Sequence, residues 1–287
     1  MNIPPELRAA FPKRPLDLHK YSAGTVTVVG GSSRYIHAPV IAGLGARAAG
    51  AGLVQLVVPD ASRIPAGSLV PEATFTKQTP ACVPPRADVT VAGMGLGVTS
   101  NSEMLLSRLL SGSTGRFVLD ADALTIVANW YAKKPTALPV PSGQELVFTP
   151  HVGEAARLLA CTPEEIQADR TDAAHRLAER YHCIAVLKGA RTVVAAPGRD
   201  DVFICPAGNP FMAMGGMGDL LSGIIGARWA YLAKNGTGDA FTATCASVWL
   251  HAAASDGLVA ADPPTDPSLV NTAHAVGSLR VRLERKA

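Results

Sequence analysis

One glycine-rich segment brings backbone amides and a carboxylate together at the start of a predicted helix. Residues 208–219 read GNPFMAMGGMGD and lead directly into a stretch with helical periodicity at 220–232. Glycines ahead of a helix let backbone N–H groups turn toward an anion, and the helix dipole favours negative charge at the same end. We therefore predict a phosphate site at this helix start.

Asp219, in the first turn of that helix, has two interpretations. It can cap the helix, which stabilises a helix by about 1 kcal/mol. Beside a bound phosphate, however, a second negative charge is unfavourable. Its presence is explained if Asp219 accepts the proton of a hydroxyl that attacks the γ-phosphate. We favour the base over the cap, and we expect the helix dipole to hold the carboxylate ionised.

Further candidates follow predicted strands, where an open α/β sheet binds its ligands. Glycine-rich turns at 30–32 and 93–97 each follow a predicted strand. His151 lies just past another strand, three residues before Glu154. Glycines often serve tight turns alone and a single histidine is often structural, so the position at the strand end is what favours a function.

These residues need a scaffold in which several strands end at one edge. Short β-branched runs alternate with Ala/Leu-rich stretches. The predicted strands cover residues 25–29, 53–58, 88–92, 117–120, 146–149 and 184–188, with 192–196 folding back as a hairpin. The predicted helices cover residues 38–49, 102–110, 121–129, 154–159, 163–181, 218–232, 240–255 and 268–283. The alternation predicts the α/β class, with a mostly parallel sheet covered by helices on both faces, in one domain over residues 1–287.

Other ligand motifs are missing from the sequence. It contains no GxxxxGK[ST] phosphate loop, no HExxH, no GxSxG and no paired Cys/His spacing. A relaxed dinucleotide fingerprint at 43–48 lies inside a predicted helix rather than after a strand, so close helix packing explains its glycines better.

Composition excludes several classes of protein. Hydrophobic residues make up 48% and charged residues 17%, which excludes a disordered chain. The net charge of +3 is too even for charge-driven nucleic-acid binding, and we interpret the basic clusters at 13–14 and 280–286 as solvated faces. We find neither a membrane span nor a signal peptide, and five cysteines without CxxC predict reduced thiols. We expect a cytoplasmic protein with no nucleic-acid or membrane partner.

Seven collinear segments are spread over nearly the whole chain, at residues 30–39, 47–54, 93–97, 119–124, 149–159, 187–192 and 208–223. In these segments the sequence resembles the ATP/ADP-dependent NAD(P)H-hydrate dehydratases of the ribokinase-like superfamily. The resemblance implies a ribokinase-like three-layer sandwich. It also implies metabolite repair: (6S)-NAD(P)HX is phosphorylated on its C6 hydroxyl by ADP or ATP with Mg²⁺, and loss of phosphate restores NAD(P)H.

The resemblance also implies roles for individual residues. Asp219 is the implied catalytic base. The residues implied to contact the hydrated substrate are Ala38, Gly95, His151 and Asp219. The residues implied to contact the nucleotide are Lys188, Gly189, Ala190, Arg191, Thr192, Asn209, Gly216 and Gly218. Within that set, the last two glycines cradle the transferring phosphoryl group. Glu154 resembles the acidic residue that organises Mg²⁺ through water.

The sequence departs from the family pattern at six positions. His37 and Arg191 each stand where the family usually has glycine, and they place bulk or charge where a ligand needs room. Arg191 can alternatively pair with a phosphate. The other departures are Ser22, Met94, Val152 and Met217.

Two other functions remain open. A small-molecule alcohol kinase of the same superfamily, of the hydroxymethylpyrimidine or thiazole type, would share Asp219 but release a stable phosphorylated product. A non-catalytic nucleotide-binding sensor would explain His37 and Arg191. The resemblance further implies a homo-oligomer, often a tetramer. Because 287 residues are too few to include the epimerase domain fused to many relatives, we expect a separate NAD(P)HX epimerase.

Overall fold

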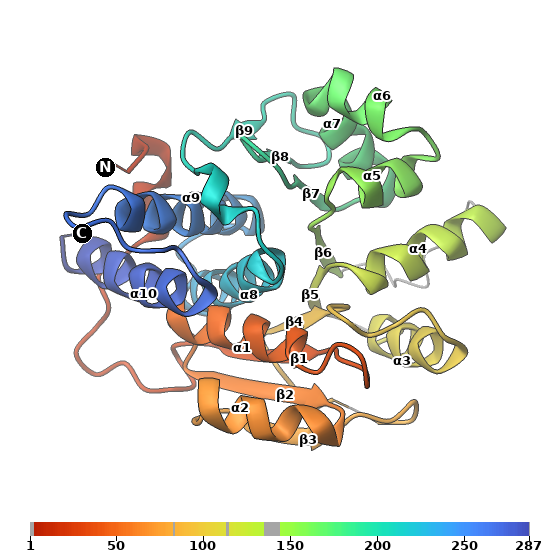
Figure 1. Cartoon of the computed structure of the whole chain (residues 1–287), viewed down its shortest axis with the longest axis horizontal. Coiled ribbons are helices and arrows are strands. Elements are labelled where there is room, and N and C mark those ends of the chain that lie inside the picture. The colour runs from red at the N-terminus through yellow and green to blue at the C-terminus, as the bar shows by residue number, and fades with distance from the viewer. Residues whose placement is uncertain (1–2, 83, 113–114, 135–143, 287) are drawn as a thin grey trace.

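A nine-stranded sheet forms the centre of the computed structural model, which describes residues 3–82, 84–112, 115–134 and 144–286 (Figure 1). The strands are β1 (Thr25–Val29), β2 (Leu53–Val58), β3 (Thr74–Lys77), β4 (Val89–Ala92), β5 (Arg116–Leu119), β6 (Glu145–Phe148), β7 (Ile184–Leu187), β8 (Val193–Ala195) and β9 (Phe203–Ile204). Their order is β3-β2-β1-β4-β5-β6-β7-β8-β9. Neighbours from β3 to β7 are parallel, whereas β8 and β9 are antiparallel. The predicted mostly parallel sheet and its terminal hairpin are confirmed.

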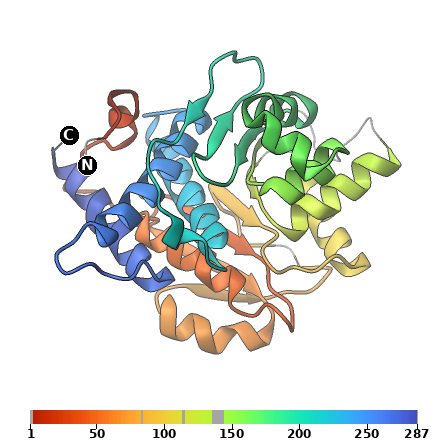
Figure 2. The same ribbon diagram turned by 45° about the horizontal axis from the view of Figure 1, so that its top comes forward.

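Helices cover both faces of the sheet, as the turned view also shows (Figure 2). One layer contains α1 (Ala38–Ala48), α2 (Arg63–Leu69), α8 (Met217–Asn235), α9 (Ala240–Val259) and α10 (Leu269–Lys286). The other contains α3 (Ser100–Leu110), α4 (Asp122–Lys133), α5 (Val152–Leu159), α6 (Pro163–Ala168) and α7 (Arg170–Tyr181). Short 3₁₀ turns occur at Pro5–Ala10, Asp60–Ser62 and Pro210–Met212. The architecture is therefore the expected three-layer α/β/α sandwich.

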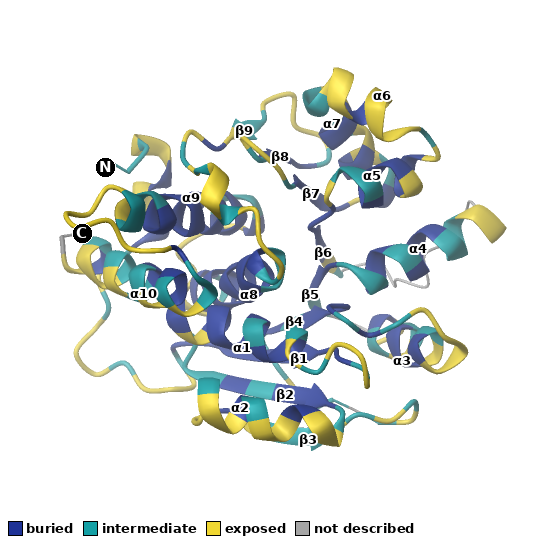
Figure 3. Ribbon diagram, viewed as in Figure 1, coloured by how far each residue is buried: buried dark blue, intermediate teal, exposed yellow. Residues whose placement is uncertain are grey.

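Two hydrophobic cores lie between these layers because alternate strand residues point to opposite faces of the sheet. In β1, Val26 and Val28 pack into the core beneath α8, whereas Val29 packs into the core beneath α3 and α4. Most of α8 and the middle of α9 are buried on every side (Figure 3). A helix enclosed in this way is apolar all round, as these two sequences are.

The packing of α1 on α8 is backbone against backbone. A Cβ atom at Gly45 would collide with the Leu220 carbonyl, and one at Gly223 would collide with the Ala42 carbonyl. The interpretation of the glycines at 43–48 as a helix-packing feature is confirmed. In the part of the chain that the structure describes, no helix is long and apolar enough to cross a bilayer.

The structure differs from the predicted elements at several points. The predicted helix at 163–181 is wrong as a single element, because Asp169 separates α6 from α7. Its side chain accepts a hydrogen bond from the Asp172 N–H at 2.9 Å and so caps the second helix. Strands β3 and β9 and helix α2 were not predicted.

Candidate active site

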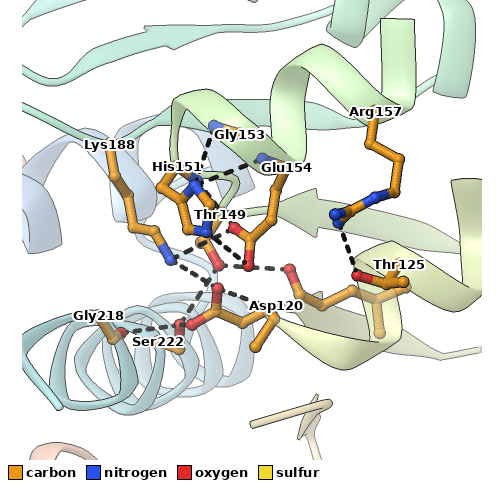
Figure 4. A network of polar contacts seen from close by, with 12 residues as sticks. Asp120, Thr125, Thr149, His151, Gly153, Glu154, Arg157, Lys188, Gly218 and Ser222 are labelled. Carbon is orange, nitrogen blue, oxygen red and sulfur yellow. Dashed lines mark hydrogen bonds and ion pairs between the residues drawn. The ribbon is translucent and has the colours of Figure 1, made fainter. Parts of the chain in front are cut away.

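Three neighbouring parallel strands, β5, β6 and β7, are each followed at once by a polar residue. These residues are Asp120, Thr149 and Lys188. Since parallel strands end at one edge, their side chains converge there. The Lys188 Nζ atom lies 2.7 Å from Asp120 Oδ1 (Figure 4). A buried ion pair therefore occupies the middle of the carboxyl edge of the sheet.

Asp120 is fully buried and holds Lys188 in place. Its second oxygen, Oδ2, accepts a hydrogen bond from Ser222 Oγ of α8 at 2.8 Å, and Oδ1 also accepts one from the Ala121 N–H at 2.9 Å. Thr149 Oγ1 lies 3.3 Å from Ser222 Oγ. Burial opposes ionisation, but the charge of Lys188 and these hydrogen bonds outweigh it and lower the pKa of Asp120. The pair is therefore ionised.

His151 and Glu154 begin α5 as a reciprocal capping box. His151 Nδ1 accepts hydrogen bonds from the Gly153 and Glu154 N–H groups at 3.0 and 3.3 Å. Glu154 Oε2 accepts one from the His151 N–H at 2.8 Å. Because Nδ1 is an acceptor, the exposed ring presents its Nε2 edge, which lies 3.4 Å from Glu154 Oε1.

Glu154 also faces Lys188, with 4.0 Å between Oε2 and Nζ. Burial and the negative charge of Asp120 raise the pKa of Glu154, although Lys188 opposes the change. The pKa of Lys188 is raised because its carboxylate neighbours outweigh the effect of burial. The single ammonium group of Lys188 therefore interacts with several carboxyl groups.

Asp219 lies in the first turn of α8, beside this group. The N-cap of α8 is Gly216, at a φ of +93°, and no side chain caps the helix. Gly218 faces the lysine closely: a Cβ there would lie 3.1 Å from Lys188 Nζ. The loop therefore leaves backbone N–H groups of α8 and one ammonium pointing at the same space.

The structure opposes the prediction that the helix dipole holds Asp219 ionised. Burial and the charges of Asp120, Glu154 and Asp122 raise its pKa to about 7, against the opposing effect of Lys188. A dipole worth about 1 kcal/mol cannot offset burial among several carboxylates. The correction strengthens the chemical interpretation, because a base works best when its pKa is near the working pH.

Two of the residues expected to contact substrate, Ala38 and Gly95, lie close to each other. A Cβ at Gly95 would lie 3.3 Å from the Cβ of Ala38 and would collide with Tyr35. The Gly31 N–H donates to the Met94 carbonyl at 2.9 Å, so both glycine-rich turns meet here. His37, the N-cap of α1, is exposed and makes no capping bond with its side chain.

The expected nucleotide-contacting residues after Lys188 form the turn between β7 and β8. Gly189, Ala190 and Arg191 are exposed, and Thr192 Oγ1 donates to the Gly189 carbonyl at 3.0 Å. Arg191 has a φ of +54°, the left-handed region that favours glycine. The backbone therefore keeps a glycine-like turn although the side chain is large.

Asn209 connects the glycine-rich loop to α9. Its Nδ2 donates to Ser255 Oγ at 3.1 Å and to Asp256 Oδ1 at 2.8 Å. Its Oδ1 accepts from the Phe211 N–H at 3.1 Å. These bonds hold the loop, and a direct contact of Asn209 with nucleotide stays a prediction.

Sequence reasoning missed Asp120, Thr149 and Ser222 as site residues. A signal was available for the first two, because each directly follows an apolar strand. Ser222 stands three residues after Asp219 and so lies on the same side of α8.

The described residues contain no group of three or more His, Cys, Asp or Glu side chains that could hold a metal ion. Glu154 already accepts one backbone N–H and faces His151 and Lys188. Mg²⁺ usually keeps several waters and takes one or two protein carboxylates together with substrate phosphates. The site fits an ion carried by a nucleotide, with Glu154 as an outer partner.

Comparison with known proteins identifies a family. Residues 26–273 match the family model described as NAD(P)H-hydrate dehydratase. The chain is 37% identical over 269 residues to the bifunctional NAD(P)H-hydrate repair enzyme Nnr of Gloeobacter violaceus, covering 90% of this chain and 50% of that protein. It is 36% identical over 249 residues to the ADP-dependent (S)-NAD(P)H-hydrate dehydratase of Neisseria meningitidis serogroup B, covering 86% and 81%.

A solved structure is similar over the whole chain. It is the ADP/ATP-dependent NAD(P)H-hydrate dehydratase of Bacillus subtilis co-crystallized with ATP/Mg²⁺, with a TM-score of 0.81 and 27% identity, covering 100% of this chain and 99% of that one. The present chain spans about half the length of the Gloeobacter relative.

Proposed function

Since the chain belongs to the NAD(P)H-hydrate dehydratase family, we propose that it dehydrates (6S)-NAD(P)HX to NAD(P)H in a reaction driven by ADP or ATP. One observation carries the proposal for this chain. Asp219 lies at the amide-rich start of α8, and its pKa is raised to about 7 among other carboxylates. It can therefore both bind and release a proton near neutral pH.

In the first step, Asp219 accepts the proton of the C6 hydroxyl of the hydrated nicotinamide ring. The hydroxyl oxygen forms a bond to the terminal phosphorus of the nucleotide, and the bond to the leaving phosphate oxygen breaks. In the second step, the C6–O bond breaks with its electron pair leaving on phosphate. Loss of a proton from the neighbouring carbon to solvent water forms the ring double bond of NAD(P)H.

Lys188 would stabilise the charge of the transferring group. Its ammonium lies beside Gly218, and Asp120 holds it from behind at 2.7 Å. Ser222 and Thr149 fix Asp120 in turn. A cation fixed before the reaction starts stabilises developing charge without reorganisation. In this mechanism Lys188 is a catalytic residue and Asp120 is a positioning residue.

Mg²⁺ would neutralise the nucleotide phosphates when bound, and Glu154 is the residue of this chain that would orient its water shell. Gly216 and Gly218 would let α8 N–H groups approach the phosphoryl oxygens. The turn at residues 188–192 and Asn209 would hold the rest of the nucleotide. Ala38 and Gly95 leave room for the hydrated ring, and the exposed ring of His151, whose Nε2 also faces Glu154 Oε1 at 3.4 Å, would contact it.

We also propose a cytoplasmic location and a homo-oligomer that works beside an NAD(P)HX epimerase. All five cysteines are free, which suits a reducing compartment. The name of the Gloeobacter relative describes a bifunctional repair enzyme, which supports a second repair activity acting on the same metabolite.

The test mixes the purified chain with hydrated NADH, Mg²⁺ and either ADP or ATP. We expect the absorbance of NADH to return, and mass spectrometry to find NADH and free phosphate as products. Accumulation of a stable phosphorylated alcohol, with a thiazole or hydroxymethylpyrimidine supplied, would instead favour the kinase. Nucleotide binding by a folded protein without turnover of either kind would favour the sensor.

A further inference from the structure

An open cavity of about 1000 Å³ lies between the end of α1 and one face of α10. Its polar lining consists of Arg47, His274, Ser278, Arg280, Arg282 and Arg285. In Figure 1, α10 lies on the left, away from the ends of β6 and β7. The cavity meets α1 at its last turn, whereas Ala38 of the candidate active site is in its first turn. The two sites are therefore separate.

Positive charge is concentrated at this cavity and directly beneath it. The residues concerned are Arg14, Arg47, Arg228, Arg280, Arg282 and Arg285. Their ion pairs within the described residues involve two carboxylates, Glu72 and Glu284. Six guanidinium groups against two carboxylates leave an excess of four positive charges, more than the net charge of +3 of the entire chain. Such an excess at a concave surface attracts anions.

The guanidinium groups are also arranged to bind an anion. Arg280 Nε donates to the Ala48 carbonyl at 3.2 Å, and Nη1 donates to Glu284 at 2.5 Å, so this side chain is fixed at the cavity wall. Arg282 and Arg285 are exposed, and neither forms an ion pair with any residue that the structure describes. His274, Ser278, Arg282 and Arg285 follow one another at spacings of three or four, which places them on one face of α10.

We propose that this cavity is a second anion site, which binds a small molecule carrying several phosphates. A planar guanidinium fork matches phosphate oxygens in pairs, and arginine keeps its charge at every physiological pH. The volume suits a ligand of nucleotide size rather than a single ion. Ala48, Ala273 and Val281 line the same cavity and offer an apolar surface to the non-phosphate part. The interpretation of this basic cluster as a solvated face is confirmed for Arg282 and Arg285, which are exposed, and is wrong for Arg280, which is partly buried.

The test titrates inorganic triphosphate and, separately, ATP by calorimetry into the wild type and two double variants. The cavity variant is Arg282→Ser with Arg285→Ser. The control is Arg86→Ser with Arg108→Ser, which removes the same charge from two other exposed arginines that have no ion pair in the described residues. All three proteins keep the phosphate site at α8, so a difference in binding stoichiometry between them reports on the cavity alone.

We expect two triphosphate sites in the wild type and the control, and one in the cavity variant, with the lost site at least tenfold weaker. Tighter binding of ATP than of triphosphate at that site would identify a nucleotide as the ligand, and equal binding would identify free polyphosphate. Equal stoichiometry in all three proteins would overturn the proposal. A cavity variant that keeps both sites but changes from oligomer to monomer in sedimentation would also overturn it, since a second copy would then cover the cavity.

Discussion

Two clusters of buried charge in this molecule have opposite compositions. At the strand ends, one ammonium, Lys188, lies among carboxylates. Asp120 is 2.7 Å from it, Glu154 is 4.0 Å from it, and the charge of Asp219 also acts on it. This cluster has more acids than bases.

Beneath α10 the proportions are reversed. One buried carboxylate, Glu284, pairs with Arg14 at 2.9 Å, Arg228 at 2.6 Å and Arg280 at 2.5 Å. Burial and the two other arginines lower the pKa of Arg228 to about 10, although Glu284 opposes the change. Arg228 also donates to the Ala10 carbonyl, so backbone oxygen supplies part of the missing negative charge.

The difference shows how the type of residue decides what an excess of charge does. A carboxyl group in an acid-rich cluster can bind a proton, so the excess appears as a raised pKa and makes Asp219 usable as a base. A guanidinium group keeps its proton near neutral pH. An arginine excess must therefore be met by carbonyl groups, aromatic faces or anions, and it contributes to stability and binding rather than to proton transfer.

The largest effect is expected for Asp219→Asn. Turnover should fall by about 10²–10⁴-fold, because the base is lost while the amides of α8 remain. The folded-state pKa of Asp219 is raised, so its ionisation costs stability as pH rises from about 4 to 7. The variant should therefore be more stable than the wild type at pH 8.

Steady-state kinetics and thermal unfolding at pH 8 check both parts. Asp172→Asn is the matched control, because Asp172 is also in the first turn of a helix but is exposed. Turnover of Asp219→Asn within threefold of the wild type would remove this residue from the mechanism.

The next effect concerns the arginine-rich cluster. Glu284→Gln should lower the free energy of unfolding by about 3–5 kcal/mol, because the buried Arg228 and the partly buried Arg14 and Arg280 lose their shared carboxylate. Glu72→Gln is the control, since the exposed pair of Glu72 with Arg47 should contribute no more than about 1 kcal/mol. Urea unfolding measures both. Equal losses of unfolding free energy in the two variants would show that Glu284 contributes no more than an exposed ion pair does.

Asp120→Asn tests the acid-rich cluster through pH. In the wild type, kcat/KM should rise tenfold per pH unit below a pKa near 7, because the deprotonated form of Asp219 is active. Removing the charge of Asp120 should move this limb about one pH unit lower. Ser222→Ala is the control: it removes a hydrogen bond but no charge, so its limb should stay in place. A purely structural role of Asp120 would lower the rate without moving the limb.

The smallest effect is expected at an arginine outside both clusters. Arg191→Gly should stabilise the fold by about 0.5–1 kcal/mol, because its φ of +54° strains any residue with a Cβ atom. Ala160→Gly, at the same φ, should gain a similar amount. A gain at Ala160 alone, measured by thermal unfolding, would show that the Arg191 side chain makes a stabilising contact.

The central elements of the fold were predictable from sequence, and the peripheral ones were not. The buried strands are β-branched runs, so Thr25–Val29 and Leu53–Val58 coincide with their predictions. Strand β3 has the sequence TFTK at the sheet edge, with no apolar run to identify it. The break at Asp169 depends on one capping side chain, which a periodicity over 19 residues conceals.

The candidate site could be predicted only in part, because some of its contacts are local in sequence and others depend on the fold. The glycine-rich approach to Asp219 is local in sequence and could be identified. The pKa of Asp219 depends on Asp120, at the end of β5, and on Glu154, in the first turn of α5. Ser222 is 102 residues from Asp120, so their hydrogen bond depends on the fold and no local pattern encodes it.

The glycine contacts between α1 and α8 have a consequence for laboratory evolution of new substrates. Because Gly45 and Gly223 leave no space between the two backbones, larger residues at the contact between α1 and α8 cannot be used to shift Asp219, the proposed base. Libraries that seek acceptance of bulkier alcohols should randomise residues 31–37 and 94–98, which include Gly31 and Gly95. Residues 42–46 and 220–223 should be kept constant. Variants recovered from such a screen should map almost entirely to the first two stretches.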